Sequence, residues 1–203
     1  MLHPDTELRF VSPEIGYGVF AKKRIPRGTY LWSLSHLDRY FTRAQFEAFP
    51  EPIRKIVMHH AVLTPEGELL MSWDNAIYIN HSCEPAIRTA QNFEIAVRDL
   101  EPGDEVTCDY GSLNAWPMNC LCGAASCRGS ISGEDVLTLG ARWDEEARRA
   151  LTEAGRVAQP VLIYASAGDR LQHEAMSADP SRMPSHMANY CPKELQIRFP
   201  SAL

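Results

Sequence analysis

Three cysteines lie within eight positions of one another, in the pattern Cys120-Leu121-Cys122 followed after four residues by Cys127. Thiolates are favoured ligands of zinc, and a structural zinc ion takes four ligands in tetrahedral geometry. Gly123 would help the loop turn sharply enough for both members of the Cys-x-Cys pair to reach one ion. The cluster therefore indicates a zinc site that lacks one ligand locally, with three unrelated cysteines as the alternative.

The fourth ligand would have to come from another part of the chain. Spacing alone does not choose among the candidates, which are Cys83, Cys191, His81, His173 and His186. The N-terminus lacks the charged start and apolar stretch of a secretory signal. We therefore expect a cytoplasmic protein, or a nuclear one if it is eukaryotic or is delivered into a host cell. In such a reducing compartment, clustered cysteines favour metal binding over disulfides.

Three shorter motifs could bind a ligand or act on it. Asn80-His81-Ser82-Cys83 ends an apolar segment, and Asp109-Tyr110-Gly111 ends another. Taken alone, the first could equally be a capped strand end with a hydrogen-bonded histidine. Gly16-Tyr17-Gly18 is too short for a dinucleotide-binding fingerprint and by itself predicts a turn. Each motif is weak evidence when it is considered singly.

Composition narrows the class of protein. The chain has 203 residues, of which 45% are hydrophobic and 23% charged, as expected for a globular domain with a well-buried core. Its formal net charge of -6 argues mildly against direct, sequence-independent binding to nucleic acid. A run of 18 or more apolar residues does not occur, so a membrane span is not expected.

Short strands are predicted to position the motifs. Runs with β character, bounded by turn signals, predict strands at residues 8–11, 19–21, 29–32, 76–83, 93–97 and 106–110. Thr42 is a suitable N-cap for a helical pattern over residues 42–61, which Pro50 and Pro52 would split into two short helices.

The second half of the chain gives fewer signals. Residues 112–130 are predicted to be a loop that carries the cysteine cluster. A helix is predicted over residues 144–154, with acidic residues in its first turn and Gly155 as its C-cap. Residues 166–194 are rich in Ser, Ala, Asp, Pro, Met and His, which predicts an irregular tail.

In their order and spacing, these motifs together resemble the SET-domain family of protein lysine methyltransferases, with its post-SET zinc loop. Residues 25–29 and Glu84-Pro85 continue the family pattern, so the match covers roughly residues 8 to 130. The resemblance implies an α+β, mainly β fold of small sheets with a pseudoknot. It divides the chain into a SET domain (8–111, with a short helical insert at about 38–75), a post-SET loop (112–130) and a C-terminal helical extension (131–203).

The resemblance also implies S-adenosylmethionine as cofactor, one structural Zn²⁺, and transfer of methyl to a lysine of a protein such as a histone. Tyr110 would be the catalytic residue, and Cys108 and Tyr110 would line the lysine channel. The implied zinc ligands are Cys83, Cys120, Cys122 and Cys127. The implied cofactor contacts are Gly16, Tyr17, Gly18, Tyr78, Asn80, His81, Tyr110 and Leu121.

Two positions depart from the family pattern. Members usually carry Tyr or Phe two positions before the catalytic tyrosine, where this chain has Cys108, and the Asn that commonly follows Cys-Glu-Pro is Ala86. Because the cysteine is smaller, we expect room for di- or trimethylation. The alternatives are an inactive SET fold that serves as a zinc-stabilised interaction module, and a plain zinc-loop protein without cofactor. The sequence leaves the oligomeric state open, a dimer included.

Overall fold

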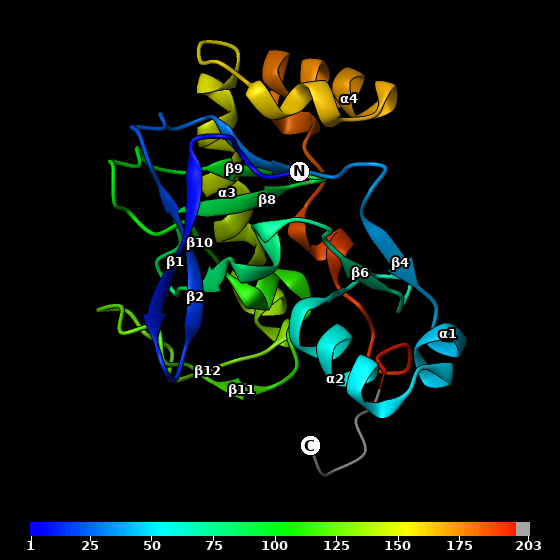
Figure 1. The fold of residues 1–203 in the computed structure, drawn as a ribbon. Helices are drawn as coiled ribbons and strands as arrows, with labels where there is room; N and C mark the ends of the chain where they lie inside the picture. Colours follow the sequence, from blue (N-terminus) through cyan, green and yellow to red (C-terminus); the bar gives the residue numbers. More distant parts are fainter. Residues whose placement is uncertain (198–203) are drawn as a thin grey trace.

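The computed structural model describes residues 1–197, which form several small sheets and a few helices (Figure 1). At the N-terminus, β1 (Thr6–Ser12) pairs antiparallel with β2 (Gly16–Ala21). Gly16 has a φ of +82°, a conformation that favours glycine, and it opens β2 directly after the turn. The expected α+β fold of small sheets is confirmed.

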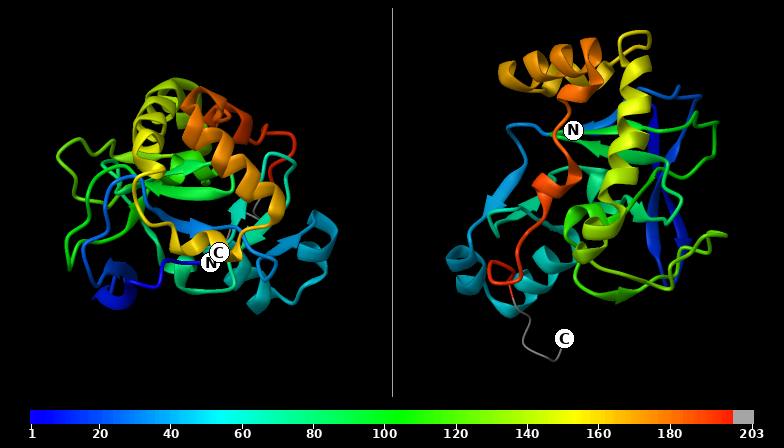
Figure 2. Two further views of the ribbon diagram at one scale, coloured as in Figure 1. Left: turned by 90° about the horizontal axis from the view of Figure 1, so that it is seen from above. Right: turned by 180° about the vertical axis from the view of Figure 1, so that it is seen from behind.

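The central sheet has the order β3-β9-β8, formed by β3 (Tyr30–Ser33), β9 (Phe93–Ala96) and β8 (Ile87–Ala90). The long helix α3 (Val136–Ala154) covers one face of it, as the view from behind shows (Figure 2). Tyr30, Phe93 and Ile95 point to that face and pack with Leu151 in a fully buried cluster. The opposite face therefore turns toward the rest of the SET-like region.

A parallel pair of very short strands joins the two central motifs. β7 (Asn80–His81) lies beside β10 (Thr107–Cys108), with Asn80 opposite Thr107 and His81 opposite Cys108. The 3₁₀ helix η2 (Tyr110–Leu113) follows directly, and the Asp109 side chain caps it by accepting the Gly111 N–H. The Asn-His motif and Tyr110 thus meet although about thirty residues separate them.

The expected helical insert is present as a small subdomain. The strands β4 (Arg39–Phe41), β6 (Leu69–Met71) and β5 (Val62–Leu63) form a sheet in that order. The helices α1 (Arg43–Ala48) and α2 (Glu51–His60) lie between β4 and β5. Thr42 and Gln45 form a reciprocal capping box at α1, and Pro50 begins α2, so the predicted pair of helices is confirmed.

The prediction of a strand over residues 76–83 is wrong in its first half. Residues Asn75–Tyr78 form the 3₁₀ helix η1, because the Asp74 side chain accepts the Ala76 N–H and caps a turn there. Strand pairing begins only at Asn80.

The prediction of one C-terminal helix and an irregular tail is also wrong. The first helix begins at Val136, eight residues before the predicted start, so Asp144 lies inside it. A second helix, α4 (Ala167–Ala178), is capped by Ser166 and buries Met176 completely. The short 3₁₀ helices η4 (Pro160–Tyr164), η5 (Pro180–Arg182) and η6 (His186–Asn189) flank it. The last residues of the predicted extension, 198–203, lie outside the described part of the chain.

Two short strands, β11 (Met118–Asn119) and β12 (Ser130–Ile131), bracket the cysteine loop and pair with each other, and the 3₁₀ helix η3 (Gly133–Asp135) leads from β12 into α3. The chain after α4 runs back past α3 toward the insert (Figure 2). Within residues 1–197, none of the helices has the length and apolar character needed to cross a membrane.

Candidate functional site

A cavity of about 860 Å³ lies between the insert, the central sheet and the cysteine loop. Most of the predicted cofactor and channel residues line it, namely Tyr17, Tyr78, Asn80, His81, Cys108, Tyr110 and Leu121. Gly16 and Gly18 do not line it. The structure therefore brings the three separate motifs of the sequence to one hollow.

The lack of a side chain at Gly18 leaves room for the Asn80 side chain. A β-carbon at Gly18 would lie 2.5 Å from the Glu105 carboxylate and 2.9 Å from the Asn80 amide nitrogen. With glycine there, the Asn80 amide donates to the Tyr17 carbonyl (3.1 Å) and to Glu105 (2.8 Å). Gly16 has open space around it. Thus Gly18 positions a cavity residue, whereas Gly16 serves the turn.

His81 contacts Tyr110 and Cys83 with its two ring nitrogens. The Tyr110 backbone N–H donates to its Nδ1 (3.1 Å), and its Nε2 lies 3.4 Å from the Cys83 sulfur. Burial lowers the pKa of His81, which favours the neutral ring. Because a backbone N–H can only donate, Nδ1 must be the unprotonated nitrogen. The hydrogen then sits on Nε2 and points to the Cys83 sulfur.

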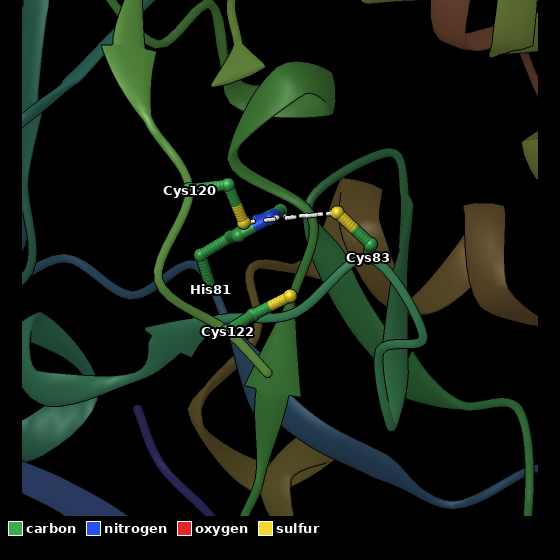
Figure 3. A group of neighbouring side chains, drawn as sticks. All are labelled: His81, Cys83, Cys120 and Cys122. Atoms are coloured by element: carbon green, nitrogen blue, oxygen red, sulfur yellow. Dashed lines mark hydrogen bonds between the residues drawn. The ribbon is translucent and has the colours of Figure 1, made fainter. Parts of the chain in front are cut away.

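The cysteines gather beside His81 (Figure 3). The ligand atoms of His81, Cys83, Cys120 and Cys122 all lie within 4.8 Å of one another. The Cys83 and Cys120 sulfurs are 3.8 Å apart. A zinc–sulfur bond of about 2.3 Å implies an edge of about 3.8 Å in a tetrahedron, so this spacing fits two ligands of one zinc ion.

Cys127 is exposed, and its sulfur is not among the four ligand atoms that lie within 4.8 Å of one another. Its thiol nevertheless affects the pKa values of both Cys120 and Cys122. Burial raises the pKa of Cys120 to about 12. For Cys122 burial acts in the same direction, but hydrogen bonds from the backbone and from the other thiols outweigh it and lower the pKa to about 7. The thiols of this crowded group thus differ in how readily they ionise. Such a group suits a divalent cation, because metal binding favours the thiolate form of each cysteine.

The other candidate ligands lie elsewhere. Cys191 is buried against the insert. His173 makes a hydrogen bond to the Tyr30 hydroxyl (3.0 Å), and His186 to the Asp144 carboxylate (2.7 Å).

Tyr110 presents its hydroxyl to the cavity from η2. The hydroxyl donates to the Ile79 carbonyl at 2.9 Å, and burial raises its pKa, so it stays protonated at neutral pH. With its proton committed to Ile79, the phenol oxygen has lone pairs left to accept from a ligand. Cys108 is buried nearby, and burial raises the pKa of its thiol.

A buried ion-pair network behind Tyr110 was not predicted. The Asp109 side chain is fully buried and accepts two hydrogen bonds from Arg128, at 2.7 and 2.9 Å, and one from Arg88 at 3.3 Å. Burial opposes ionisation of Asp109, but the Arg128 pair outweighs it and holds the pKa of the carboxyl below its usual value. Arg128 directly follows Cys127 in the sequence, and Asp109 directly precedes Tyr110, which is the signal that could have suggested the pair.

Comparison with known proteins places the motifs in one family. Residues 16–111 match the family model described as SET domain. The chain is 30% identical over 152 residues to histone-lysine N-methyltransferase Set2 of Drosophila melanogaster, a match that covers 68% of this chain and 6% of that protein. It is 38% identical over 60 residues to histone-lysine N-methyltransferase Suv4-20 of Caenorhabditis elegans, covering 28% of this chain and 21% of that protein.

Similarity at the level of the fold is weaker. The methyltransferase domain of human histone-lysine N-methyltransferase SETMAR gives a TM-score of 0.45 at 16% identity, over 64% of this chain and 58% of that chain. The assignment therefore rests on the sequence matches. The chain spans only a small part of the curated relatives that it matches, 6% of the length of Set2 and of ash1 of Drosophila melanogaster.

Replacing Arg128 with alanine should lower the free energy of unfolding by about 2 to 3 kcal/mol, because a buried carboxylate loses charge-assisted hydrogen bonds. Arg128→Lys should recover only part of the loss, since an ammonium cannot reproduce the paired contacts. Arg142→Ala is the matched control, as the Arg142 side chain is 54% exposed. Urea unfolding followed by circular dichroism measures all three. Equal stability of the Arg128→Ala and Arg142→Ala proteins would contradict this assignment.

Proposed function

We propose that this protein transfers methyl groups from S-adenosylmethionine to a lysine side chain of another protein, because residues 16–111 match the SET-domain family model. The observation that carries the proposal is the shared cavity. Tyr110, Cys108 and the Asn80-His81 pair line one hollow, and the thiol cluster stands at its edge. We further propose the division into a SET domain (8–111), a post-SET loop (112–130) and an extension (131–203).

Methyl transfer to an amine is a direct displacement, so the residues must bind, orient and desolvate. An unperturbed lysine has a pKa of about 10.4, and holding its amine neutral at pH 7 requires roughly 4 to 5 kcal/mol. A buried, largely apolar channel lowers that pKa, and the sulfonium charge acts in the same direction. The Tyr110 oxygen would accept a hydrogen bond from the amine and align it for attack.

The residues around the cavity fit the cofactor. The amide nitrogen of Asn80 is engaged by Tyr17 and Glu105, which leaves its carbonyl oxygen to accept from the cofactor's ammonium. We assign the His81 backbone to the adenine. Tyr17 and Tyr78 meet edge to face, with ring centroids 6.0 Å apart, and would flank the ligand. Leu121 is 71% exposed between two cysteines and would cover its apolar face.

For the zinc ion, we propose Cys83, Cys120, Cys122 and Cys127 as ligands. His81 belongs to the same tight group, yet its Nε2 carries the hydrogen and cannot bind a metal in that tautomer. It instead donates to the Cys83 thiolate. The backbone N–H groups of Arg128 and Gly129 donate to Cys83 and Cys127, both at 3.4 Å. Such outer hydrogen bonds orient metal ligands and stabilise their charge.

For the substrate, we propose a basic protein. The relatives named above are histone-lysine methyltransferases, and the net charge of -6 suits a cationic partner. We propose a cytoplasmic location, or a nuclear one in a eukaryotic cell or host.

Tyr110→Phe should lower kcat for methyl transfer by roughly 10²-fold or more, because the oxygen that orients the amine is lost. Its dissociation constant for S-adenosylmethionine should change less than about threefold. Radiolabelled methyl transfer onto histones and other basic proteins, with calorimetry for the cofactor, measures both quantities. Cofactor binding without transfer by the unaltered protein to any substrate would favour the inactive interaction module. Absence of cofactor binding by the zinc-loaded protein would favour the plain zinc-loop protein.

The small side chain at Cys108 leads us to propose di- or trimethylation. Cys108→Tyr should shift the product toward monomethyl-lysine, since the larger ring fills the space beside the amine. Cys191→Ala is a control for loss of a thiol away from the cavity. Mass spectrometry of the peptide product at full turnover distinguishes the states. Only monomethyl product from the unaltered protein would contradict the proposal.

Removal of zinc should lower both thermal stability and cofactor affinity, because Cys83 ties the loop to the strand that carries Asn80 and His81. Cys127→Ala should lose most of its zinc, whereas His81→Ala should retain one equivalent. Metal content after dialysis and calorimetry with the cofactor measure these effects. Zinc retained by Cys127→Ala and lost by His81→Ala would reverse the assignment of the fourth ligand.

A further inference from the structure

Glu94 is a buried carboxyl group without an obvious structural purpose. It lies in β9 and is 8% exposed. Its Oε1 accepts a hydrogen bond from the Thr89 hydroxyl (2.8 Å), but its Oε2 is buried and has no hydrogen-bond partner within residues 1–197. Burying half of a carboxyl group without a partner is unfavourable, and such groups concentrate at functional sites.

The sheet directs this carboxyl group into the cavity. Phe93 and Ile95 pack toward α3, so Glu94 between them points to the opposite face. Thr89 stands directly opposite Glu94 on β8, and both residues line the cavity that also holds Cys108 and Tyr110. The charge of Glu94 raises the pKa of the Cys108 thiol, second only to burial, and both residues line the same cavity.

Few other charges reach Glu94. From β8, Arg88 favours its ionised form, but the Arg88 guanidinium is bound to Asp109 and Glu146. From β10, Cys108 lines the same cavity, and burial raises the pKa of its thiol, which favours the neutral form. The remaining titratable groups that face the cavity from neighbouring elements include His81, Tyr110 and His186. The only hydrogen bond to the carboxylate among the described residues is therefore the one from Thr89.

We propose that Glu94 accepts the proton from the target ammonium, so that the lysine reaches the methyl donor as a neutral amine. This inference rests on the proposed methyl transfer. An N–H bond of the ammonium breaks and an O–H bond forms on the Glu94 carboxylate, which gives a neutral amine and a neutral carboxylic acid. The amine nitrogen then forms a bond to the methyl carbon of S-adenosylmethionine, and the electrons of the broken C–S bond go to sulfur. The product carries the positive charge, and Glu94 releases its proton to solvent.

The environment suits this role. Burial raises the pKa of Glu94 to about 7, against the smaller opposing effects of Thr89 and Arg88. A proton acceptor works best when its pKa lies near the working pH. Exchanging a buried ion pair for two neutral groups is also favoured where water is excluded. The alternative is a structural carboxyl that shares a buried water with Trp32, whose indole N–H also lacks a partner in the described chain.

Two variants distinguish a proton acceptor from a purely structural carboxyl group. Glu94→Gln keeps the shape of the side chain but cannot accept the proton. Thr89→Val keeps Glu94 but removes the hydrogen bond that lowers its pKa. The experiment is the pH dependence of kcat at saturating S-adenosylmethionine and histone peptide. For the unaltered protein we expect kcat to rise with an apparent pKa near 7. In Thr89→Val this rise should move to higher pH. In Glu94→Gln it should vanish, with kcat lowered about 10²-fold at pH 8.

Thermal unfolding gives a readout that does not depend on turnover. Because the pKa of Glu94 is raised in the folded state, its contribution to stability is complete below the unfolded value of about 4.3 and is lost as pH rises through about 7. Between pH 5 and 8 the unaltered protein should lose more thermal stability than Glu94→Gln. This slope shows that Glu94 titrates in the folded protein.

The outcomes are distinct. An active protein in which Glu94→Gln keeps the rise in kcat near pH 7 would overturn the role of Glu94 and leave the proposed function intact. The same holds if Thr89→Val leaves the rise in place, or if the thermal slopes of the unaltered protein and Glu94→Gln are equal. An unaltered protein that binds the cofactor but methylates no lysine would overturn the proposed function and this inference with it.

Discussion

The arrangement of the site depends on one buried carboxylate, Asp109. A charge removed from water must be paired, and the arginines that pair with Asp109 come from β8 and from the end of the cysteine loop. Its Oδ1 also accepts the Gly111 N–H, which caps η2 and so fixes the backbone of Tyr110. Arg88 extends the network to Glu146 and lies over the ring of Trp143, both on α3. Central sheet, cysteine loop and C-terminal helix are thereby held around the base of the cavity.

His81 links the two halves of the site in a similar way. Its ring accepts from the Tyr110 backbone and donates to the Cys83 sulfur, while the parallel pairing of β7 and β10 sets its position along the chain. The thiol cluster is therefore linked directly to a residue that lines the cavity. A displacement of the cysteine loop would act on His81 through the Cys83–Cys120 contact, and on the segment before Tyr110 through the Arg128–Asp109 ion pair. Metal and cofactor are therefore expected to depend on each other.

The sequence predicted those features of the fold and the candidate site whose signals are local. Thr42 and Pro50 mark the N-termini of two helices, and the order of the motifs indicated the family. Predictions failed where a polar residue caps a helix inside a segment whose overall composition indicates another structure. Asp74 caps a 3₁₀ turn inside an apolar stretch, and Ser166 begins a helix in a segment whose composition is typical of loops. The sequence sets Asp109 and Arg128 beside predicted site residues, but that they pair, and the direction of the His81 ring, depend on long-range packing that sequence spacing does not encode. Glu94 did leave a signal, as a charged residue between Phe93 and Ile95 in a buried strand.

The roles proposed for Cys108 and Glu94 depend on each other. On the proposed function, room beside the amine is of use only if the amine can lose a proton again after each transfer, since every methylated product below the trimethyl state returns as a cation. A small side chain at position 108 would supply the room, and the Glu94 carboxyl group, which lines the same cavity, would supply the proton acceptor. On these proposals, the small residue at position 108 and the buried carboxyl group in β9 would serve the same reaction, and the stability that the Glu94 charge costs at neutral pH would be offset by repeated deprotonation of the substrate.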